Sequence, residues 1–129
     1  MQYMLMDHEP AAEIGKRVDQ AEAPAYWGAW NACLGTMNQA GIVVSGNGLQ
    51  PPQMSTTGRL RGGKRQVQDG PFADTKEHLG GYFIVEVPSL DVALEWAVRA
   101  PRAATGSTEV RPVLPPPVTA QDDVARSDP

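Results

Sequence analysis

Side chains able to exchange protons gather in one stretch of the chain, residues 67–87, which read VQDGPFADTKEHLGGYFIVEV. Asp69, Lys76 and Glu77 lie in this stretch, and His8 ends an apolar N-terminal segment from which it could approach the same loop. Carboxylates, ammonium groups and imidazoles are the usual general acids and bases of enzymes. These four residues are our candidates for acid–base catalysis. The plainer interpretation is a solvated His8 and a surface ion pair between Lys76 and Glu77.

Four side chains of the same region could offer metal ligands: Asp69, Asp74, Glu77 and His78. Carboxylate oxygens with one imidazole can bind a divalent cation. Their spacing matches no established metal motif, and carboxylates are common in turns. We therefore expect no metal site and no cofactor.

Among the candidate sites of this stretch, the one that we choose is a ligand site at the turn formed by residues 69–72. Asp69 can accept hydrogen bonds from the turn backbone, a glycine and a proline follow, and the turn then presents Phe72. We expect a small hydrophobic cleft lined by Trp27, Trp30, Asp69, Phe72 and Tyr82. A purely structural turn, in which Asp69 only accepts backbone hydrogen bonds, is slightly favoured over this ligand site.

Two helices are predicted around this region. The first spans residues 25–40, with Pro24 in its first turn, Gly41 after its end, and an apolar stripe of Trp27, Trp30, Leu34 and Met37. Core packing is the simpler role for that stripe, and the lining of a pocket by one Trp is the alternative. The second helix starts after Ser89, ends before Pro101, and has a predicted buried stripe of Leu90, Ala93, Leu94 and Ala97.

Strands are predicted at residues 1–7, 42–45, 82–87 and 109–114. Residues 1–7 and 82–87 are apolar on both faces, which is typical of central strands covered on both sides. Gly62-Gly63 predicts a hairpin turn that pairs Arg61 with Lys64. One face of this hairpin is basic and the other carries Leu60 and Val67. We interpret the basic face as a solvated edge, with binding of an acidic partner as the alternative.

The order of elements, β-α-β-hairpin-β-α-β, predicts an α+β, ferredoxin-like fold with a mostly antiparallel sheet and both helices on one face. Strands that are apolar on both faces would leave the other face of this sheet exposed. An exposed apolar face of that size usually marks an interface. We expect a homodimer that forms through the sheet faces.

Composition limits the functional class. The 129 residues are enough for one domain, which we place at residues 1–114, followed by a disordered Pro-rich tail at 115–129. The net charge of -4 gives no reason to expect direct nucleic-acid binding. No apolar run is long enough to span a membrane, and the N-terminus lacks the features of a signal peptide. With Cys33 as the single cysteine, we expect a cytoplasmic protein.

The run DGPFADTKEHLGGYFIVEV closely resembles the signature of the YCII-related, DGPF-type family, which is named after residues 69–72 as they stand here. AGIVVSGNGLQPP, SLDVALEWAVRAP and EVRPVLP also resemble segments of that family, so the resemblance covers residues 1–114. It implies a dimeric α/β barrel built from ferredoxin-like protomers, in agreement with the order of elements. Members often occur beside sigma factors, which implies a regulatory or ligand-sensing role.

Some relatives carry a His near the start of the first long helix and an Asp near the end of the second, proposed as an acid–base pair. The corresponding positions here are Tyr26 and Ala100, so that pair is absent. We therefore expect a non-catalytic dimeric module that binds a small molecule or a protein partner. A small acid–base enzyme at the DGPF cleft is the alternative, and a purely structural role is a third.

Overall fold

A four-stranded antiparallel sheet forms the centre of the molecule. The computed structural model describes residues 1–70 and 75–115. The strands lie in the order β2-β5-β1-β6, so β1 and β5 are central and β2 and β6 are the edges. Their bounds are β1 Gln2–Pro10, β2 Val43–Gly48, β5 Glu77–Glu86 and β6 Ser107–Pro112. This order is that of the ferredoxin-like fold, as predicted.

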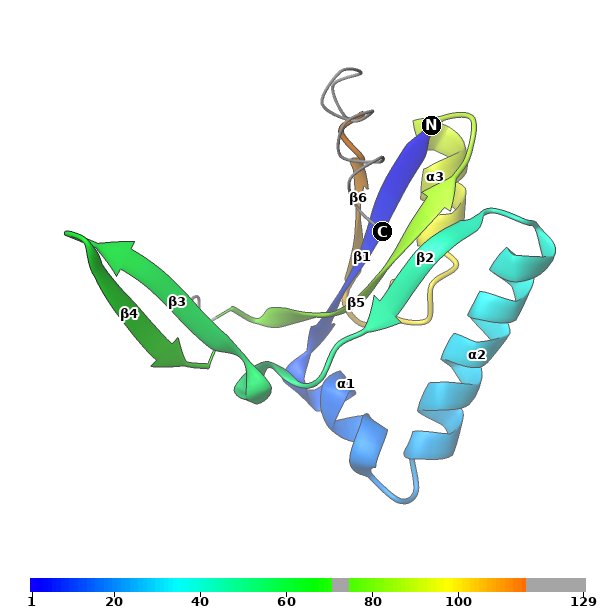
Figure 1. Ribbon diagram of the computed structural model, residues 1–129. Helices are drawn as coiled ribbons and strands as arrows, with labels where there is room; N and C mark the ends of the chain where they lie inside the picture. The colour runs from blue at the N-terminus through cyan, green and yellow to red at the C-terminus, as the bar shows by residue number, and fades with distance from the viewer. Residues whose placement is uncertain (71–74, 116–129) are drawn as a thin grey trace, which may run out of the picture.

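Both long helices lie on the same face of this sheet (Figure 1). They are α2 (Ala23–Gln39) and α3 (Leu90–Ala97), and a short α1 (Ala11–Gly15) continues into a 3-10 turn at Lys16–Val18. Ser89 caps α3 as predicted, because the backbone N–H of Val92 donates to Ser89 Oγ at 3.3 Å. The expected α+β class is confirmed. A single chain forms an open sheet, so a closed barrel would need a second copy.

The face of the sheet under the helices is the core. Tyr3 and Leu5 alternate along β1 toward this face and pack with Val85 of β5 and Met37 of α2. Strand alternation places every second side chain on the same face, and β1 keeps this pattern through its whole length.

The predicted stripes of the two helices need correction. Trp27 is 45% exposed and Tyr26 is buried, so α2 is turned to present Tyr26 and Met37 to the sheet. In α3, Leu90 and Leu94 are exposed whereas the small Ala93 and Ala97 are buried. Because Ala93 and Ala97 are small, the α3 backbone can approach the sheet closely when they face it. The larger leucines then lie on the exposed side of the helix.

The lengths and positions of the strands also differ from expectation. The segment 42–45, predicted as a short buried strand, is part of the edge strand β2, and most of β2 is exposed. Strand β1 runs to Pro10, beyond the predicted end at residue 7, and β5 begins at Glu77, before the predicted start at residue 82. Cross-strand pairing with β1 extends β5 over these residues.

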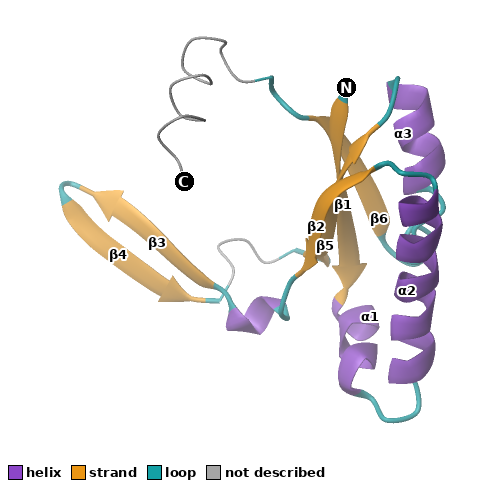
Figure 2. Cartoon of the chain, turned by 45° about the vertical axis from the view of Figure 1, so that its right-hand side comes forward, coloured by secondary structure: helices purple, strands orange, loops and turns teal. Residues whose placement is uncertain are grey.

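No helix of the described residues covers the second face of the sheet, which we call the open face. Its centre consists of four half-buried side chains, Met4, Met6, Tyr82 and Ile84. The expectation of strands apolar on both faces is confirmed for β1 and β5. Within one chain only the helix face is covered by helices (Figure 2).

The predicted hairpin forms a separate two-stranded sheet of β3 (Thr56–Arg61) and β4 (Lys64–Asp69). Arg61 pairs with Lys64 as predicted. Gly62 and Gly63 have φ of 56° and 74°, the left-handed conformation that such a two-residue turn requires. The hairpin projects away from the main sheet (Figure 1).

Some predictions fall on residues outside those described. Phe72 and Asp74, both named as site candidates, and nearly all of the predicted tail lie there. In the described ranges, no helix is both long and apolar enough to cross a membrane.

Candidate functional site

A cleft opens between α2 and the helix face of the sheet, with a volume of about 220 Å³. Its floor is a row of residues paired across three strands, in which Asp7 of β1 faces Gly81 of β5 and Gly81 faces Gly48 of β2. Helix α2 supplies the side chains of Trp27 and Trp30 to the walls. The glycines leave the floor without side chains, so the cleft exists because these positions are small.

Two carboxylates continue the buried face of β1 into this cleft. Asp7 and Glu9 follow Tyr3 and Leu5 in the strand alternation, and both line the cleft. Asp7 is 2% exposed and Glu9 is fully buried. Buried carboxylates are costly unless they are hydrogen-bonded or paired with cations, so their partners define the site.

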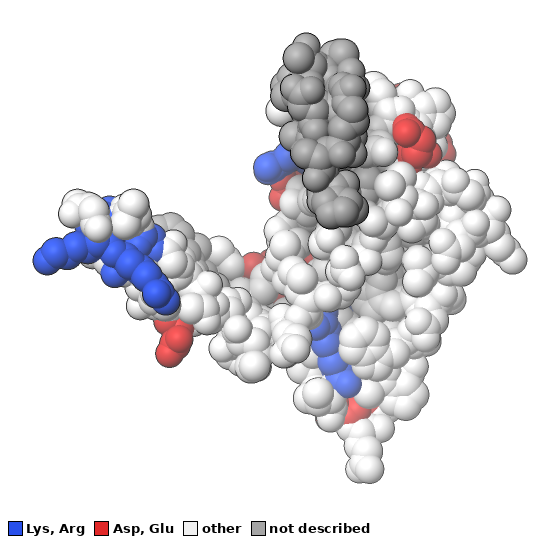
Figure 3. Space-filling model, in the orientation of Figure 1, with Lys and Arg blue, Asp and Glu red and all other residues white. Residues whose placement is uncertain are grey.

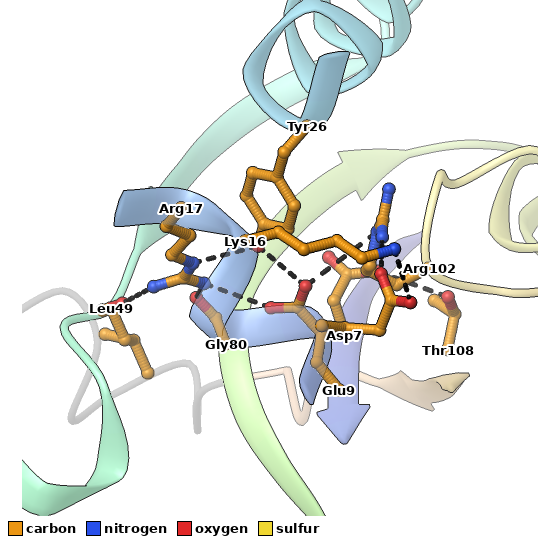
Figure 4. Close-up of polar contacts among 10 residues, drawn as sticks. Asp7, Glu9, Lys16, Arg17, Tyr26, Leu49, Gly80, Arg102 and Thr108 are labelled. Atoms are coloured by element: carbon orange, nitrogen blue, oxygen red, sulfur yellow. Dashed lines mark hydrogen bonds and ion pairs between the residues drawn. The ribbon is translucent and has the colours of Figure 1, made fainter. Parts of the chain in front are cut away.

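Glu9 is held by three partners (Figure 4). Tyr26 Oη donates to Glu9 Oε1 at 2.6 Å, and Arg17 Nη2 donates to Glu9 Oε2 at 3.0 Å. Arg102 Nε lies 3.8 Å from Glu9 Oε1. With this set of contacts, the Glu9 carboxylate serves as the fixed centre of the cluster.

Arg17 links four segments of the chain. Besides Glu9, its guanidinium donates to Tyr26 Oη at 2.9 Å, to the Gly80 carbonyl at 3.1 Å and to the Leu49 carbonyl. It also lies over the Trp27 ring, 5.6 Å from the ring centre. Arg17 therefore fixes the position of α2 relative to β1, β5 and the segment after β2.

A second ionic group closes the other side of the cluster. Arg102 forms an ion pair with Glu13, and Lys16 Nζ lies 3.0 Å from the same carboxylate. The Arg102 guanidinium also lies 4.8 Å from the centre of the Tyr26 ring. These contacts tie α1 to the segment after α3, around the buried Glu9.

Asp7 has a different electrostatic environment from Glu9. The pKa of Asp7 is raised from 3.8 to about 7, mainly by burial; a hydrogen bond from Thr108 Oγ1 opposes the rise, and the neighbouring Glu9 adds to it. That hydrogen bond is 3.2 Å long. At neutral pH the Asp7 carboxyl is thus divided between its acid and base forms. A group with this pKa can both donate and accept a proton.

Tyr26 is a hydrogen-bond donor in this site. Burial, followed by its hydrogen bond to Glu9, raises the pKa of the Tyr26 phenol above its usual value. The phenol therefore stays protonated at neutral pH and continues to donate to Glu9. Ala100, the other position discussed from the family resemblance, is half-buried and has no titratable group.

Glycine is required where the backbone approaches the acidic cluster. A Cβ at Gly80 would overlap the Glu9 carboxylate and lie 2.9 Å from Arg17 Nη2. A Cβ at Gly81 would lie 3.0 Å from the carbonyl oxygen of Asn47 on β2. The double glycine thus allows the backbone of β5 to approach the Glu9 carboxylate and β2 closely.

The structure brings together two of the five predicted ligand-binding side chains. Trp27 and Trp30 line the cleft, and the Trp30 ring lies 6.2 Å from that of Phe83. Tyr82 borders the cleft from β5, but its side chain belongs to the open face, beside Met6. Asp69 lies elsewhere, exposed at the end of the hairpin strand β4. Phe72, the fifth, lies outside the described residues.

The predicted catalytic candidates lie apart from this cleft. His8 Nε2 is 3.1 Å from Glu109 Oε1 on β6, and Lys76 is exposed. Glu77 accepts a hydrogen bond from Ser107 Oγ at 2.7 Å. His8, Glu77 and His78 do line a separate groove beside the segment after β2. Among the described residues, no group of three His, Cys, Asp or Glu side chains could hold a metal ion.

Sequence reasoning missed the central residues of the cleft, Asp7, Glu9 and Arg17. The signal was the alternation of Tyr3, Leu5, Asp7 and Glu9, which places the two acids on the buried face if the strand continues past residue 7. Charged residues were instead taken to end the strand. The partners of Glu9 could not be inferred because Arg102 is far away in the chain.

Comparison with known proteins identifies the family to which this chain belongs. The model of the YCII-related domain matches residues 1–116, and the chain belongs to this family. The predicted membership is confirmed.

Two similar proteins illustrate the relationship. An uncharacterized protein, R00369 of Rhizobium meliloti (strain 1021), is 45% identical over 67 residues, which are 50% of this chain and 54% of that protein. The match thus spans about half the length of that relative. Among solved structures, 5-chloro-2-hydroxyhydroquinone dehydrochlorinase (TftG) from Burkholderia phenoliruptrix AC1100, in complex with 2,5-dihydroxybenzoquinone, is similar with a TM-score of 0.50 and 16% identity. That similarity covers 88% of this chain and 94% of the other, and shows a shared fold.

Proposed function

We propose that the cleft between α2 and the sheet binds a small planar organic molecule with a polar substituent directed toward Asp7. The observation that carries this proposal is a buried carboxyl with a pKa of about 7 in a cleft walled by aromatic rings. Sites for small molecules combine mostly apolar walls with a few convergent polar groups, as this cleft does.

The shape of the cleft favours a flat ligand. Trp27 and Trp30 present ring surfaces from α2, and the opposite side is the bare backbone of Gly48 and Gly81. A ring can stack on an indole while its other face lies against glycine backbone, where a branched molecule would meet the strands.

Asp7 is the group that would recognise a polar substituent. The Glu9 carboxylate already accepts hydrogen bonds from Tyr26 and Arg17. Asp7 has one hydrogen bond from Thr108. In its acid form it can donate to a carbonyl oxygen, and in its base form it can accept from a hydroxyl group.

Acid–base catalysis at this site is the second candidate function. It is favoured by the pKa of Asp7, which lies near neutrality, where a general acid or base works best. The fold is shared with a dehydrochlorinase that was solved with a planar dihydroxyquinone. This likeness agrees with a planar ligand and leaves the reaction of this chain open to experiment.

Nuclear magnetic resonance of the indole N–H groups tests the proposal. Trp27 and Trp30 line the cleft, whereas Trp96 lines a separate groove with Cys33 and Arg99 and serves as an internal control. We expect 2,5-dihydroxybenzoquinone, or another hydroxylated flat ring, to shift the signals of Trp27 and Trp30 and leave Trp96 unchanged. A saturated six-membered diol should shift none. Shifts confined to Trp96, or none with any flat ring, would contradict the proposal.

A homodimer through the open face is the assembly that we propose for this module. The half-buried Met4, Met6, Tyr82 and Ile84 form an apolar centre there, and pairing two such faces would remove it from water. A regulatory link to a sigma factor and a cytoplasmic location stay predictions from the sequence.

A further inference from the structure

We propose that the hairpin formed by β3 and β4 is an arm that clasps a second copy of this chain. The inference extends the open-face dimer proposed above and is independent of any ligand in the cleft. Four features of the hairpin support it: its direction, its exposed apolar side chains, its charge and its small size.

The direction of the hairpin places it beside the open face. In two views related by a turn of 45°, α2 and α3 lie on one side of the main sheet and the hairpin projects from the other side (Figures 1 and 2). A second copy seated on the open face would therefore occupy the space next to the hairpin.

The hairpin exposes apolar side chains that a partner could cover. Leu60 is 68% exposed and Val67 is 53% exposed. Leu60 pairs with Arg65, and Val67 pairs with Gly58, so the two apolar side chains share one face of the hairpin.

A two-stranded hairpin is marginally stable by itself in water. Here its base is tied by the backbone N–H of Gly70, which donates to the Ser55 carbonyl at 2.7 Å, and by Thr57 Oγ1, which donates to the Gly70 carbonyl at 3.2 Å. Both contacts are at the base, so further packing against a partner would stabilise the projecting strands.

Charge complementarity selects a second copy as the partner. Residues 59–65 contain four of the eleven Lys and Arg and no Asp or Glu. The rest of the chain has seven Lys and Arg against fifteen Asp and Glu. Figure 3 shows the basic side chains gathered on the hairpin. A basic arm on an acidic body fits another copy of the same body, and it would be repelled by another basic arm.

Isotope-coded cross-linking tests the contact directly. Lys64, one of three lysines in the chain, stands at the tip of the hairpin. Chains labelled with nitrogen-14 and nitrogen-15 are mixed, treated with a carbodiimide that joins lysine to carboxylates, and digested. We expect Lys64 to be linked to Asp or Glu peptides of the opposite isotope. Links of Lys64 only to its own isotope would overturn the clasp.

The second experiment measures the dimer dissociation constant of hairpin variants by sedimentation equilibrium. Leu60→Thr with Val67→Thr places β-branched residues, which suit a strand, at both positions and removes the larger apolar groups of the hairpin. We expect this pair to raise the dimer dissociation constant about tenfold or more, because a tenfold change needs only ~1.4 kcal/mol. Val98→Thr, an equally simple change at the exposed end of α3, should leave the constant unchanged.

The outcomes separate the clasp from the other proposals. A dimer whose constant is unaffected by the Leu60 and Val67 changes would overturn the clasp and leave the open-face dimer standing. A wild-type chain that is monomeric at ~100 µM would overturn both, while ligand binding in the cleft would still be decided by the indole signals. Lys64 protected by duplex DNA at physiological salt, with no link between chains, would overturn the clasp in favour of nucleic acid.

Discussion

Asp7 is the residue on which the proposed chemistry of this cleft depends. Its neighbour Glu9 lies on the same face of β1, yet the two carboxylates have different surroundings. Glu9 accepts hydrogen bonds from two donors and lies near a further guanidinium, whereas Asp7 accepts a hydrogen bond from Thr108. Unequal surroundings can give two acids of one strand different roles. Glu9 organises the structure, and Asp7 is the carboxyl that exchanges a proton near neutral pH.

Stability should depend on pH through Asp7. The folded pKa of about 7 is above the ordinary value of 3.8, so the folded chain keeps a proton that the unfolded chain has lost. The contribution of Asp7 to the free energy of unfolding therefore falls as pH rises between these values. Asp7→Asn is neutral at every pH and can still accept from Thr108. We expect the stability of the variant relative to wild type to increase by on the order of a few kcal/mol as pH rises from about 4 to about 7.

Urea unfolding of both chains across this pH range measures the difference. Because the other titrating groups are common to both chains, their contributions cancel in the comparison. A stability difference that stays constant with pH would show that the Asp7 pKa is ordinary.

At the scale of elements, the close approach of β5 to β1 is set by glycine. Gly80 faces the Glu9 carboxylate and the Arg17 guanidinium, and a Cβ there would overlap the carboxylate. The groups that approach Gly80 could not be inferred from the sequence, because Glu9 and Arg17 come from elements far away in the chain. The hairpin turn at Gly62-Gly63 and the cap at Ser89 were predictable because their hydrogen bonds are local.

Substitution of two glycines tests this packing. Gly80→Ala should destabilise the fold by about 2–3 kcal/mol, because the methyl group must displace Glu9 or Arg17. Gly28→Ala is the matched control: its position in α2 is exposed and has open space around it, so alanine should stabilise the helix by up to ~1 kcal/mol. The free energy of unfolding in denaturant reports both. Equal stability of Gly80→Ala and wild type would mean that the acidic cluster is loosely held.

At the scale of the whole molecule, the fold was predictable and the site was only partly so. The order of elements predicts a ferredoxin-like sheet, and the apolar alternation of β1 and β5 identifies the two central strands. The location of the cleft was not predictable, because the residues of the DGPF turn drew attention to Asp69, whereas α2 and the glycine row form the cleft elsewhere. The location of the cleft depends on which strands and helices pair in the folded chain, and local sequence carries little information about that pairing.

The direct test of the central claim is a carbon-13 titration of the Asp7 carboxyl by nuclear magnetic resonance, with and without 2,5-dihydroxybenzoquinone. We expect a midpoint near pH 7 in the free protein and a displaced midpoint when the ring occupies the cleft. A midpoint near the ordinary value of 3.8, unchanged by the added ring, would contradict it.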